Sequence, residues 1–128
     1  MQFLEFRFAF SARDFEQSVR FYTDLLGMNY LSGWDRAEGK GALVSAGGNA
    51  VVEIYGAPTD GSYTGPTPAA INLALRVTNR TEVDGWHQKL EQAGADILER
   101  PTDQAWGHRS FIVNDPDGIP IHIYCELE

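Results

Sequence analysis

The stretch "DPDGIPIHIYCE" (Asp115–Glu126) joins a turn to a strand whose two faces differ. Pro116 and Gly118 stand at the second and fourth turn positions, as a type I turn prefers. Successive side chains of a strand point to opposite sides. The apolar side carries Ile119, Ile121, Ile123 and Cys125, and the other side carries Pro120, His122, Tyr124 and Glu126. We therefore expect a strand that packs on a core by one face and presents His122 on the opposite, open face.

Two residues of this strand carry expectations of their own. Cys125 shares the apolar face, so we predict a buried small hydrophobe rather than a reactive thiol. As the sole cysteine it cannot form a disulfide within the chain, which favours a reducing compartment. Pro120 has no N–H to donate to a β-ladder, so we expect an edge strand or an irregularity at this residue.

The elements before this strand complete a module of the order βαβββ. A strand over residues 70–77 ("AINLALRV") places an apolar side chain at every second position. Thr81 is predicted to cap a helix that ends at Gly94. The apolar side of this helix is formed by Val83, Trp86, Leu90 and Ala93. Three strands follow, over residues 95–100, 108–114 and 119–126.

The first half of the chain repeats this order. The stretch "FLEFRFAF" (residues 3–10) predicts a strand with Glu5 and Arg7 on its polar face. Its apolar face carries Leu4, Phe6, Phe8 and Phe10. Asp14 is expected to cap a helix, with Gln17 completing a capping box. Gly27 is expected to end that helix. Its apolar side is formed by Phe15, Val19, Tyr22, Leu25 and Leu26.

Three short strands are expected next, at about 28–33, 41–45 and 50–55. "AGGN" (Ala46–Asn49) supplies a hairpin turn before the last of them. The two expected helix caps, Asp14 and Thr81, lie 67 residues apart in the sequence, and so do the two expected helix ends, Gly27 and Gly94. The sequence therefore predicts an α+β domain over residues 1–128, with a first module over 1–57, a linker over 58–69 rich in Gly, Pro, Ser and Thr, and a second module over 70–128.

In such an arrangement each helix covers the apolar face of its own strands. The opposite faces are then expected to curl toward each other and enclose a cleft between the modules. The polar residues expected on these open faces are Glu5, Arg7, Glu53, Asn72, His122 and Tyr124.

Composition restricts the class of protein. Hydrophobic residues make up 43% of the 128, which is typical of a globular domain. The formal net charge of −8 disfavours nucleic acid as a partner. No apolar run approaches the roughly 18 residues of a membrane span. "MQFLEFRF" lacks a basic region followed by an apolar stretch, so we expect no secretory signal and a cytoplasmic location.

With these features the chain resembles the vicinal oxygen chelate superfamily, which includes glyoxalase I, bleomycin-resistance proteins and extradiol dioxygenases. The resemblance rests on "DFEQSVRFYTDLLGM" (Asp14–Met28), "AVVEIYG" (Ala50–Gly56), "INLALRV" (Ile71–Val77) and "WGHRSFIVNDPDGIPIHIYCE" (Trp106–Glu126). It covers nearly the whole chain in order. It implies two βαβββ modules that form curved mixed sheets around a cleft, and a homodimer. One fold serves many chemistries, so it does not fix a reaction.

Metal-chelating members of the superfamily place one ligand on the open face of each of four strands. By this resemblance Glu53 matches the carboxylate on the last strand of the first module. His122 matches a position that is usually Glu, and Asn72 falls where His is usual. On the first strand, matching by the helix cap selects Arg7, and matching by the last apolar residue selects Glu5.

Two kinds of site remain open. In the first, Glu53, His122 and Glu5 hold one divalent ion (Zn, Fe, Mn or Ni), because such sites need about three ligands of these types. In the second, Arg7 occupies the first-strand position. A guanidinium cannot ligate a metal and repels one, so the pocket would be metal-free.

In a metal-free pocket the same residues take other roles. Arg7 pairs with Glu53 or holds a ligand carboxylate or phosphate. His122 serves as a hydrogen-bond partner or a general base, and Asn72 as a ligand contact. Stacking surface is expected from Tyr124, Tyr55, Trp34 and Trp106.

Other candidates carry less support. Packing at a strand end is the favoured interpretation of Trp106, ahead of stacking on a ligand. His87 is expected at the boundary of the second helix. His108 is expected at a strand entrance, where a place on the cleft rim and a place in a turn are equally compatible with the sequence. Solvated surface is the default expectation for Arg76 and Arg109. No G-x-S-x-G motif and no phosphate-binding loop occurs.

We therefore expect a glyoxalase/bleomycin-resistance-like protein that binds a small metabolite or toxic compound in the cleft, with an incomplete metal site. Whether it also converts that compound stays open. Catalytic roles would fall to His122 and Glu53. The alternative is a divalent-metal-dependent lyase, resembling lactoylglutathione lyase, or a dioxygenase that uses Glu53 and His122 as ligands. A pure binding domain without turnover is also compatible with the composition.

Overall fold

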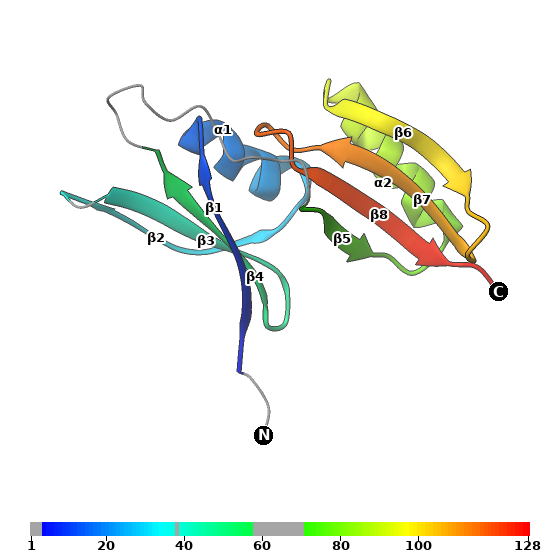
Figure 1. Cartoon of the computed structure of the whole chain (residues 1–128), viewed down its shortest axis with the longest axis horizontal. Coiled ribbons are helices and arrows are strands. Elements are labelled where there is room, and N and C mark those ends of the chain that lie inside the picture. Colours follow the sequence, from blue (N-terminus) through cyan, green and yellow to red (C-terminus); the bar gives the residue numbers. More distant parts are fainter. Residues whose placement is uncertain (1–3, 38, 58–70) are drawn as a thin grey trace. The chain divides into compact units, whose positions relative to one another are not determined.

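The structure, a computed structural model, describes residues 4–37, 39–57 and 71–128. The chain divides into two compact units, Met1–Thr67 and Pro68–Glu128. Each unit holds one four-stranded sheet and one principal helix (Figure 1). The α+β class and the two modules in one chain are thus confirmed. The linker predicted over residues 58–69 lies outside the described residues.

The first unit contains β1 (Phe6–Ala12), α1 (Phe15–Arg20), a π-helical turn (Phe21–Leu25), β2 (Asn29–Arg36), β3 (Gly39–Gly47) and β4 (Ala50–Gly56). The strand order is β1-β4-β3-β2, with β1 parallel to β4 and the other neighbours antiparallel. The "AGGN" turn joins β3 to β4, as predicted. Gly47 and Gly48 adopt positive φ there, which glycine does without steric cost.

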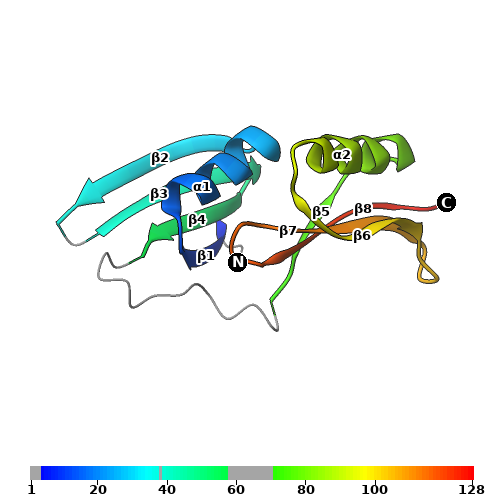
Figure 2. The same cartoon turned by 90° about the horizontal axis from the view of Figure 1, so that it is seen from above.

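The second unit repeats this topology. It contains β5 (Leu73–Arg76), α2 (Arg80–Gln92), β6 (Asp96–Asp103), β7 (His108–Asn114) and β8 (Pro120–Glu126). The order is β5-β8-β7-β6, again with a parallel first pair. Within each unit the helix lies along one side of its sheet, which leaves the opposite side without a helix (Figure 2).

The strand alternation predicted for β8 is confirmed. Ile121, Ile123 and Cys125 are at most 2% exposed, while the residues between them are half-buried. Phe111 and Val113 of β7 are fully buried beside them. The core of this unit therefore lies between the helix-facing side of the sheet and α2. Cys125 belongs to that core, as expected for a buried small hydrophobe.

In β1 the apolar row is buried only at its end. Phe10 is 7% exposed, but Phe6 is 74% exposed and Leu4, before the strand, is 89% exposed. The prediction that Leu4 and Phe6 share the buried face with Phe10 is therefore wrong. α1 has only six residues, and it begins at Phe15, shortly after β1 ends at Ala12.

The first helix begins as predicted and then changes form. Asp14 is its N-cap, and its carboxylate accepts a hydrogen bond of 3.0 Å from the Gln17 N–H. After Arg20 the backbone widens into a π-helical turn, where the Leu26 N–H donates to the Phe21 carbonyl. The buried side chains are Ser18, Phe21, Tyr22 and Leu26. The predicted apolar stripe is thus correct at Tyr22 and Leu26, and the turn ends before Gly27, whose φ is 70°.

The second helix is capped by Asn79, not by Thr81. The Asn79 side chain accepts a 3.0 Å hydrogen bond from the Glu82 N–H, and the Glu82 carboxylate accepts one of 2.8 Å from the Thr78 N–H. Thr81 lies inside the helix. The start of the helix was predicted two residues late, so the spacing between the two halves is not constant. Val83 and Leu90 are buried as predicted, Trp86 is half-buried and Ala93 is exposed.

The turn before β8 is the predicted one. The Gly118 N–H donates to the Asp115 carbonyl at 3.1 Å, and the buried Asp115 carboxylate accepts from two further backbone N–H groups. β8, however, is an inner strand, so the expectation of an edge strand is wrong. Pro120 is tolerated because it is the first residue of β8 and β5 pairs only from Ile121 onward.

Among the described residues, no helix has the length and apolar character needed to cross a membrane.

The helix cap gives a direct test of this local structure. Asn79→Ala is expected to lower the free energy of unfolding by about 1 kcal/mol, because the Glu82 N–H loses its partner. Thr81→Ala, the matched control, should change it by only a few tenths of a kcal/mol. Urea denaturation followed by circular dichroism measures both. A larger effect at Thr81 than at Asn79 would contradict the observed cap.

Candidate functional site

The open face of the first sheet carries an arginine between two carboxylates. Arg7 lies on β1 and Glu53 on the neighbouring β4, on the side away from α1. The Arg7 Nη1 lies 3.3 Å from the Glu53 carboxylate, and its Nε donates to the Glu5 carboxylate. Glu5 and Arg7 are thus paired with each other, and which of them occupies the first-strand ligand position stays a prediction.

Tyr55 extends this set of interactions along β4. A hydrogen bond to Glu53 is the largest cause that raises the pKa of the Tyr55 hydroxyl. The hydrogen bonds to Glu5 and then Glu53 likewise raise the pKa of Arg7, which therefore stays charged. We call Glu5, Arg7, Glu53 and Tyr55 the Arg7 network. Its Glu53 side chain is only 14% exposed, whereas Arg7 is 40% exposed and can be reached by a ligand.

The Tyr55 pKa has a consequence for stability. A group whose pKa is raised in the folded protein stabilises the fold at pH values below its unfolded pKa, about 10 for tyrosine. That contribution is lost as the pH rises through the folded value. Near neutral pH the Tyr55 hydroxyl is therefore protonated and donates to Glu53.

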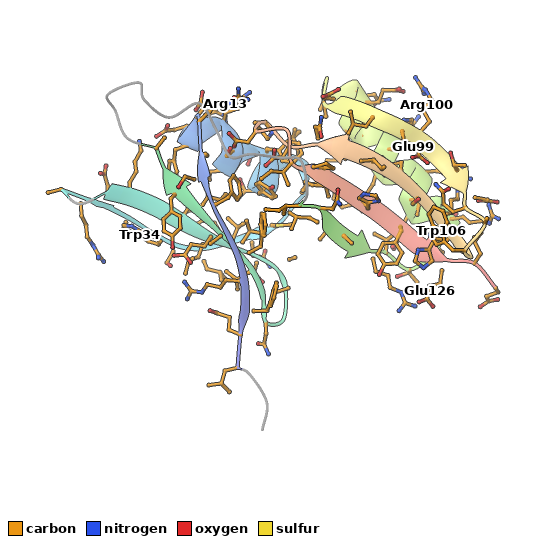
Figure 3. All side chains as sticks on the ribbon, in the orientation of Figure 1. Arg13, Trp34, Glu99, Arg100, Trp106 and Glu126 are labelled. Atoms are coloured by element: carbon orange, nitrogen blue, oxygen red, sulfur yellow. The ribbon has the colours of Figure 1, made fainter. Side chains whose placement is uncertain are left out.

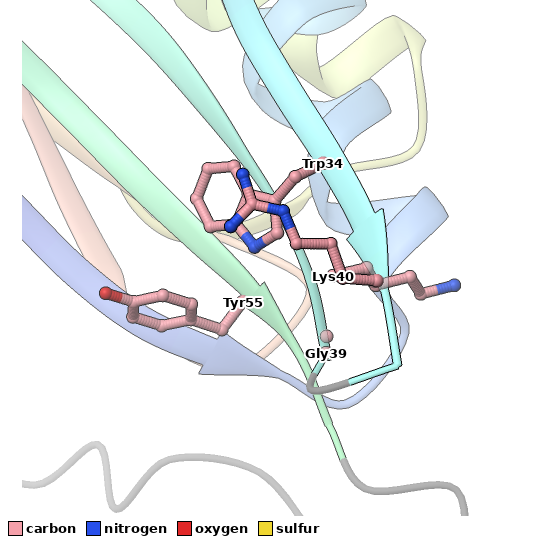
Figure 4. A pocket seen from close by; sticks show the side chains of 6 residues that line it. Trp34, Gly39, Lys40 and Tyr55 are labelled. Carbon is pink, nitrogen blue, oxygen red and sulfur yellow. The ribbon is translucent and has the colours of Figure 1, made fainter.

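A pocket of about 510 Å³ lies beside this network, at the edge of the sheet where β2 and β4 end and β3 begins (Figure 4). It is lined by Trp34, Arg36, Gly39, Lys40, Tyr55 and Gly56. The Trp34 and Tyr55 rings meet edge to face, with centroids 6.3 Å apart. The predicted stacking residues Trp34 and Tyr55 are thus brought together in one unit.

Gly41 permits this arrangement. It pairs with Trp34 on β2 and with Tyr55 on β4, so it lies between the two aromatic residues. A Cβ at Gly41 would stand 2.2 Å from the Trp34 ring, which is therefore laid against the backbone of β3. The position of Trp34 thus depends on the missing side chain at Gly41.

The open face of the second sheet carries His122, as predicted. On β8 it pairs with Ala74 of β5 and Ile112 of β7 and is half-buried. Tyr124, two residues on, stacks on the His108 ring with centroids 4.6 Å apart. His108 therefore belongs to this face rather than to an isolated turn.

Polar partners on this face were missed in the sequence. The Gln104 amide donates to the Glu99 carboxylate at 2.7 Å and to the Ser110 hydroxyl at 3.2 Å. Ser110 pairs with Tyr124 in the ladder, and its alternation along β7 would have placed it here.

The remaining predicted residues take different places. Trp106 lies in the turn between β6 and β7 and is 69% exposed, so the favoured interpretation, a packed strand-end residue, is wrong (Figure 3). Asn72 precedes β5 and is exposed. Arg76 is exposed and pairs with Glu126 at 3.2 Å.

Arg109 and His87 lie on the helix side of the second sheet. Arg109 forms ion pairs with Asp84 and Asp103, and its side chain is only 20% exposed, so the expectation of solvated surface is wrong. His87 is half-buried, as a boundary residue should be, and its ring meets Phe111 edge to face at 5.4 Å.

Glu5 and Glu53 do not fit a divalent ion in the arrangement that the structure describes. Arg7 uses carboxylate oxygens of both Glu5 and Glu53 and places a positive charge between them. Over residues 4–37, 39–57 and 71–128, no three side chains of His, Cys, Asp or Glu gather as a ligand set. Glu5 and Glu53 belong to one unit and His122 to the other, so the predicted three-ligand set stays a prediction.

Gly41→Ala tests the aromatic arrangement. The added methyl group is expected to displace the Trp34 ring from Tyr55, with a loss of about 1–3 kcal/mol of unfolding free energy. The indole N–H resonance of Trp34, assigned through Trp34→Phe, reports the displacement. Gly85→Ala is the control, since a Cβ there meets open space. An unshifted Trp34 resonance in Gly41→Ala would contradict the described pocket.

Comparison with known proteins places the chain in a family. The sequence model of the Glyoxalase/Bleomycin resistance protein/Dioxygenase superfamily matches residues 6–123. No curated protein sequence gives a significant match.

Solved structures share the fold at low identity. The glyoxalase/bleomycin resistance protein/dioxygenase domain from Frankia sp. EAN1pec superposes with a TM-score of 0.82, at 18% identity, over 100% of this chain and 94% of that one. TnmS3, an antibiotic-binding protein from Streptomyces sp. CB03234, gives 0.76 at 23%, over 98% and 97%. Lactoylglutathione lyase from Agrobacterium tumefaciens gives 0.70 at 15%, over 93% and 90%.

These likenesses show the fold, and the sequence match spans nearly the whole chain. The protein belongs to the Glyoxalase/Bleomycin resistance protein/Dioxygenase superfamily.

Proposed function

We propose that the protein binds a small metabolite or toxic compound through its own open-face side chains and not through a metal ion. The observation that carries this proposal is the pairing of Arg7 with both Glu5 and Glu53. A cation bound to these carboxylates would have to displace the guanidinium and accept its repulsion.

Arg7 is equipped to contact a ligand directly. A guanidinium has five N–H donors, and among the described residues Arg7 points its Nε and one Nη nitrogen at carboxylates. Its other donors stay available to a carbonyl, hydroxyl or carboxylate of a ligand. Glu53 holds the guanidinium in place and is itself fixed by the Tyr55 hydroxyl. A fixed donor binds its ligand with a smaller loss of side-chain entropy.

Aromatic surface stands beside the polar groups in both units. Trp34 and Tyr55 line the pocket of the first unit, and His108 and Tyr124 stack on the open face of the second. This combination of flat apolar area and a few polar groups is typical of small-molecule sites. The antibiotic-binding protein TnmS3 has the same fold, which is compatible with sequestration. The expected inter-module cleft, homodimer and cytoplasmic location stay predictions.

A metal-dependent lyase or dioxygenase with Glu53 and His122 as ligands is the second candidate. The repeat favours it, because β4 and β8 hold equivalent places in their sheets. Glu53 lies opposite Ala9 on β1, and His122 lies opposite Ala74 on β5. The lactoylglutathione lyase fold is compatible with this candidate. Arg7 argues against it, and general-base catalysis by His122 needs no metal.

The proposal is tested by binding in the presence of a chelator. A thermal-shift screen of drug-like and metabolite-like compounds is run with EDTA and, separately, with Zn²⁺ or Mn²⁺. We expect at least one compound to raise the melting temperature equally in both conditions. Its affinity should fall about tenfold or more in Arg7→Gln, since a charge-assisted hydrogen bond is lost.

Arg20→Gln, an exposed charge change on α1, is the matched control and should bind as the wild type does. If every stabilising compound required the metal, the proposal would be overturned in favour of the second candidate.

A further inference from the structure

We infer that the pocket at the edge of the sheet where β2 and β4 end and β3 begins takes a planar aromatic ligand that carries one negative charge. This inference rests on the proposed function, since it assigns a ligand class to one part of the same open face. Four features of the pocket support it: the orientation of Trp34, the edge contact with Tyr55, the charge of Arg36, which no described carboxylate pairs, and the engaged charge of Lys40.

Trp34 offers one ring face for stacking. Its other face is laid against β3 at Gly41, where a Cβ would stand only 2.2 Å away. Tyr55 meets it edge to face, with an angle of 68° between the ring planes. The Trp34 ring is thereby fixed in orientation, while the residue remains half-buried and not fully covered. A fixed, partly exposed indole is a platform for a second flat ring.

Arg36 supplies the charge. It follows Trp34 by two residues on β2, so both side chains lie on the same side of the strand. Both also line the pocket. In the part of the chain that the structure describes, no carboxylate pairs with Arg36. Its guanidinium is therefore available to a ligand anion, which it can bind through two parallel hydrogen bonds.

Lys40 adds no second free charge. Its ammonium lies 3.1 Å from the Glu16 carboxylate and 5.1 Å from the Phe15 ring centroid, both on the helix side of the sheet. Its alkyl stem passes Gly56, where a Cβ would stand 2.7 Å from the Lys40 Cγ. Lys40 therefore contributes an apolar wall (Figure 4). Among the described residues that line the pocket, Arg36 is the cation without a carboxylate partner, and one such cation beside one stacking platform matches a monoanion rather than a dianion or a cation.

The size of the pocket agrees with this ligand class. At about 510 Å³ it falls within the range of small-molecule sites, roughly 300–1,000 Å³. A fused two-ring system with one carboxylate is small enough to enter, and it can place its ring on Trp34 and its anion at Arg36. The overall charge of −8 disfavours anions elsewhere on the surface, so binding should depend on this local cation.

The test compares three probes by isothermal titration calorimetry on the full chain. They are 2-naphthoate, which is planar and anionic; 2-naphthamide, which is planar and neutral; and cyclohexanecarboxylate, which is anionic and not planar. The proteins are wild type, Arg36→Gln, Trp34→Leu and the control Arg100→Gln, whose exposed charge lies on β6 of the other unit.

We expect wild type to bind 2-naphthoate about tenfold more tightly than 2-naphthamide, through the charge-assisted hydrogen bonds of Arg36. Arg36→Gln should remove that preference. Trp34→Leu should weaken both naphthyl probes about tenfold, and cyclohexanecarboxylate should bind more weakly than 2-naphthoate. Arg100→Gln should match wild type.

Equal affinity for the amide and the carboxylate in wild type would overturn the inference. So would a preference that survives in Arg36→Gln, or the absence of naphthyl binding at millimolar concentration. Arg36 is exposed, so Arg36→Gln is expected to leave the fold intact. It therefore tests the inference even if Trp34→Leu disturbs the fold. Chelator-insensitive binding of another compound, lost in Arg7→Gln, would leave the proposed function standing while this inference fails.

Discussion

Among the described residues, each sheet is covered by a helix on one side, and this constraint is clearest in the sequences of β7 and β8 of the second unit. The side of the strand that faces the helix must be apolar, and the other side is free to carry polar groups. On β8 this separates the buried Ile121 and Ile123 from His122 and Tyr124. On β4 it separates the buried Val52 and Ile54 from Glu53 and Tyr55. The candidate site is a consequence of the same alternation that builds the core.

Much of the fold could be predicted because its signals are local. Strand alternation, the turn that ends at Gly118 and the glycines that end the helices each act within a few residues. Other features depend on partners distant in sequence. That β8 is an inner strand, and that Phe6 stays exposed, could not be read from periodicity, because neither depends on the strand alone. The π-helical turn after Arg20 left no signal in the pattern of apolar residues.

Some signals were present and were missed. Asn79 is followed three residues later by Glu82, which is the capping-box spacing, and this signal favours Asn79 over Thr81 as the cap. Arg109 precedes the buried Phe111 by two residues on β7, so both side chains point to the same side of the sheet. That position indicates an arginine that faces the helix and needs acidic partners. Gly41 inside a strand indicates a close approach by another group, here the Trp34 ring. Each of these residues helps to position a neighbouring element or a pocket wall.

For the site, sequence and resemblance assigned Glu5, Arg7 and Glu53 to one open face and left two arrangements open, a metal site and an Arg7–Glu53 pair. The structure shows Arg7 paired with Glu53 and also with Glu5, a second pair that no sequence pattern indicated. In the proposed function, this ion pairing makes Arg7 a fixed hydrogen-bond donor for a ligand. Because the superfamily fold serves many chemistries, the proposal rests on this polar network and not on the fold.

The central claim is that Arg7, and not a metal, occupies the carboxylates of the first sheet. Elemental analysis of protein purified after expression with Zn, Fe, Mn and Ni supplied tests it most directly. We expect no metal in stoichiometric amount. One equivalent of a single metal per chain, removed by both Glu53→Gln and His122→Ala, would contradict the claim.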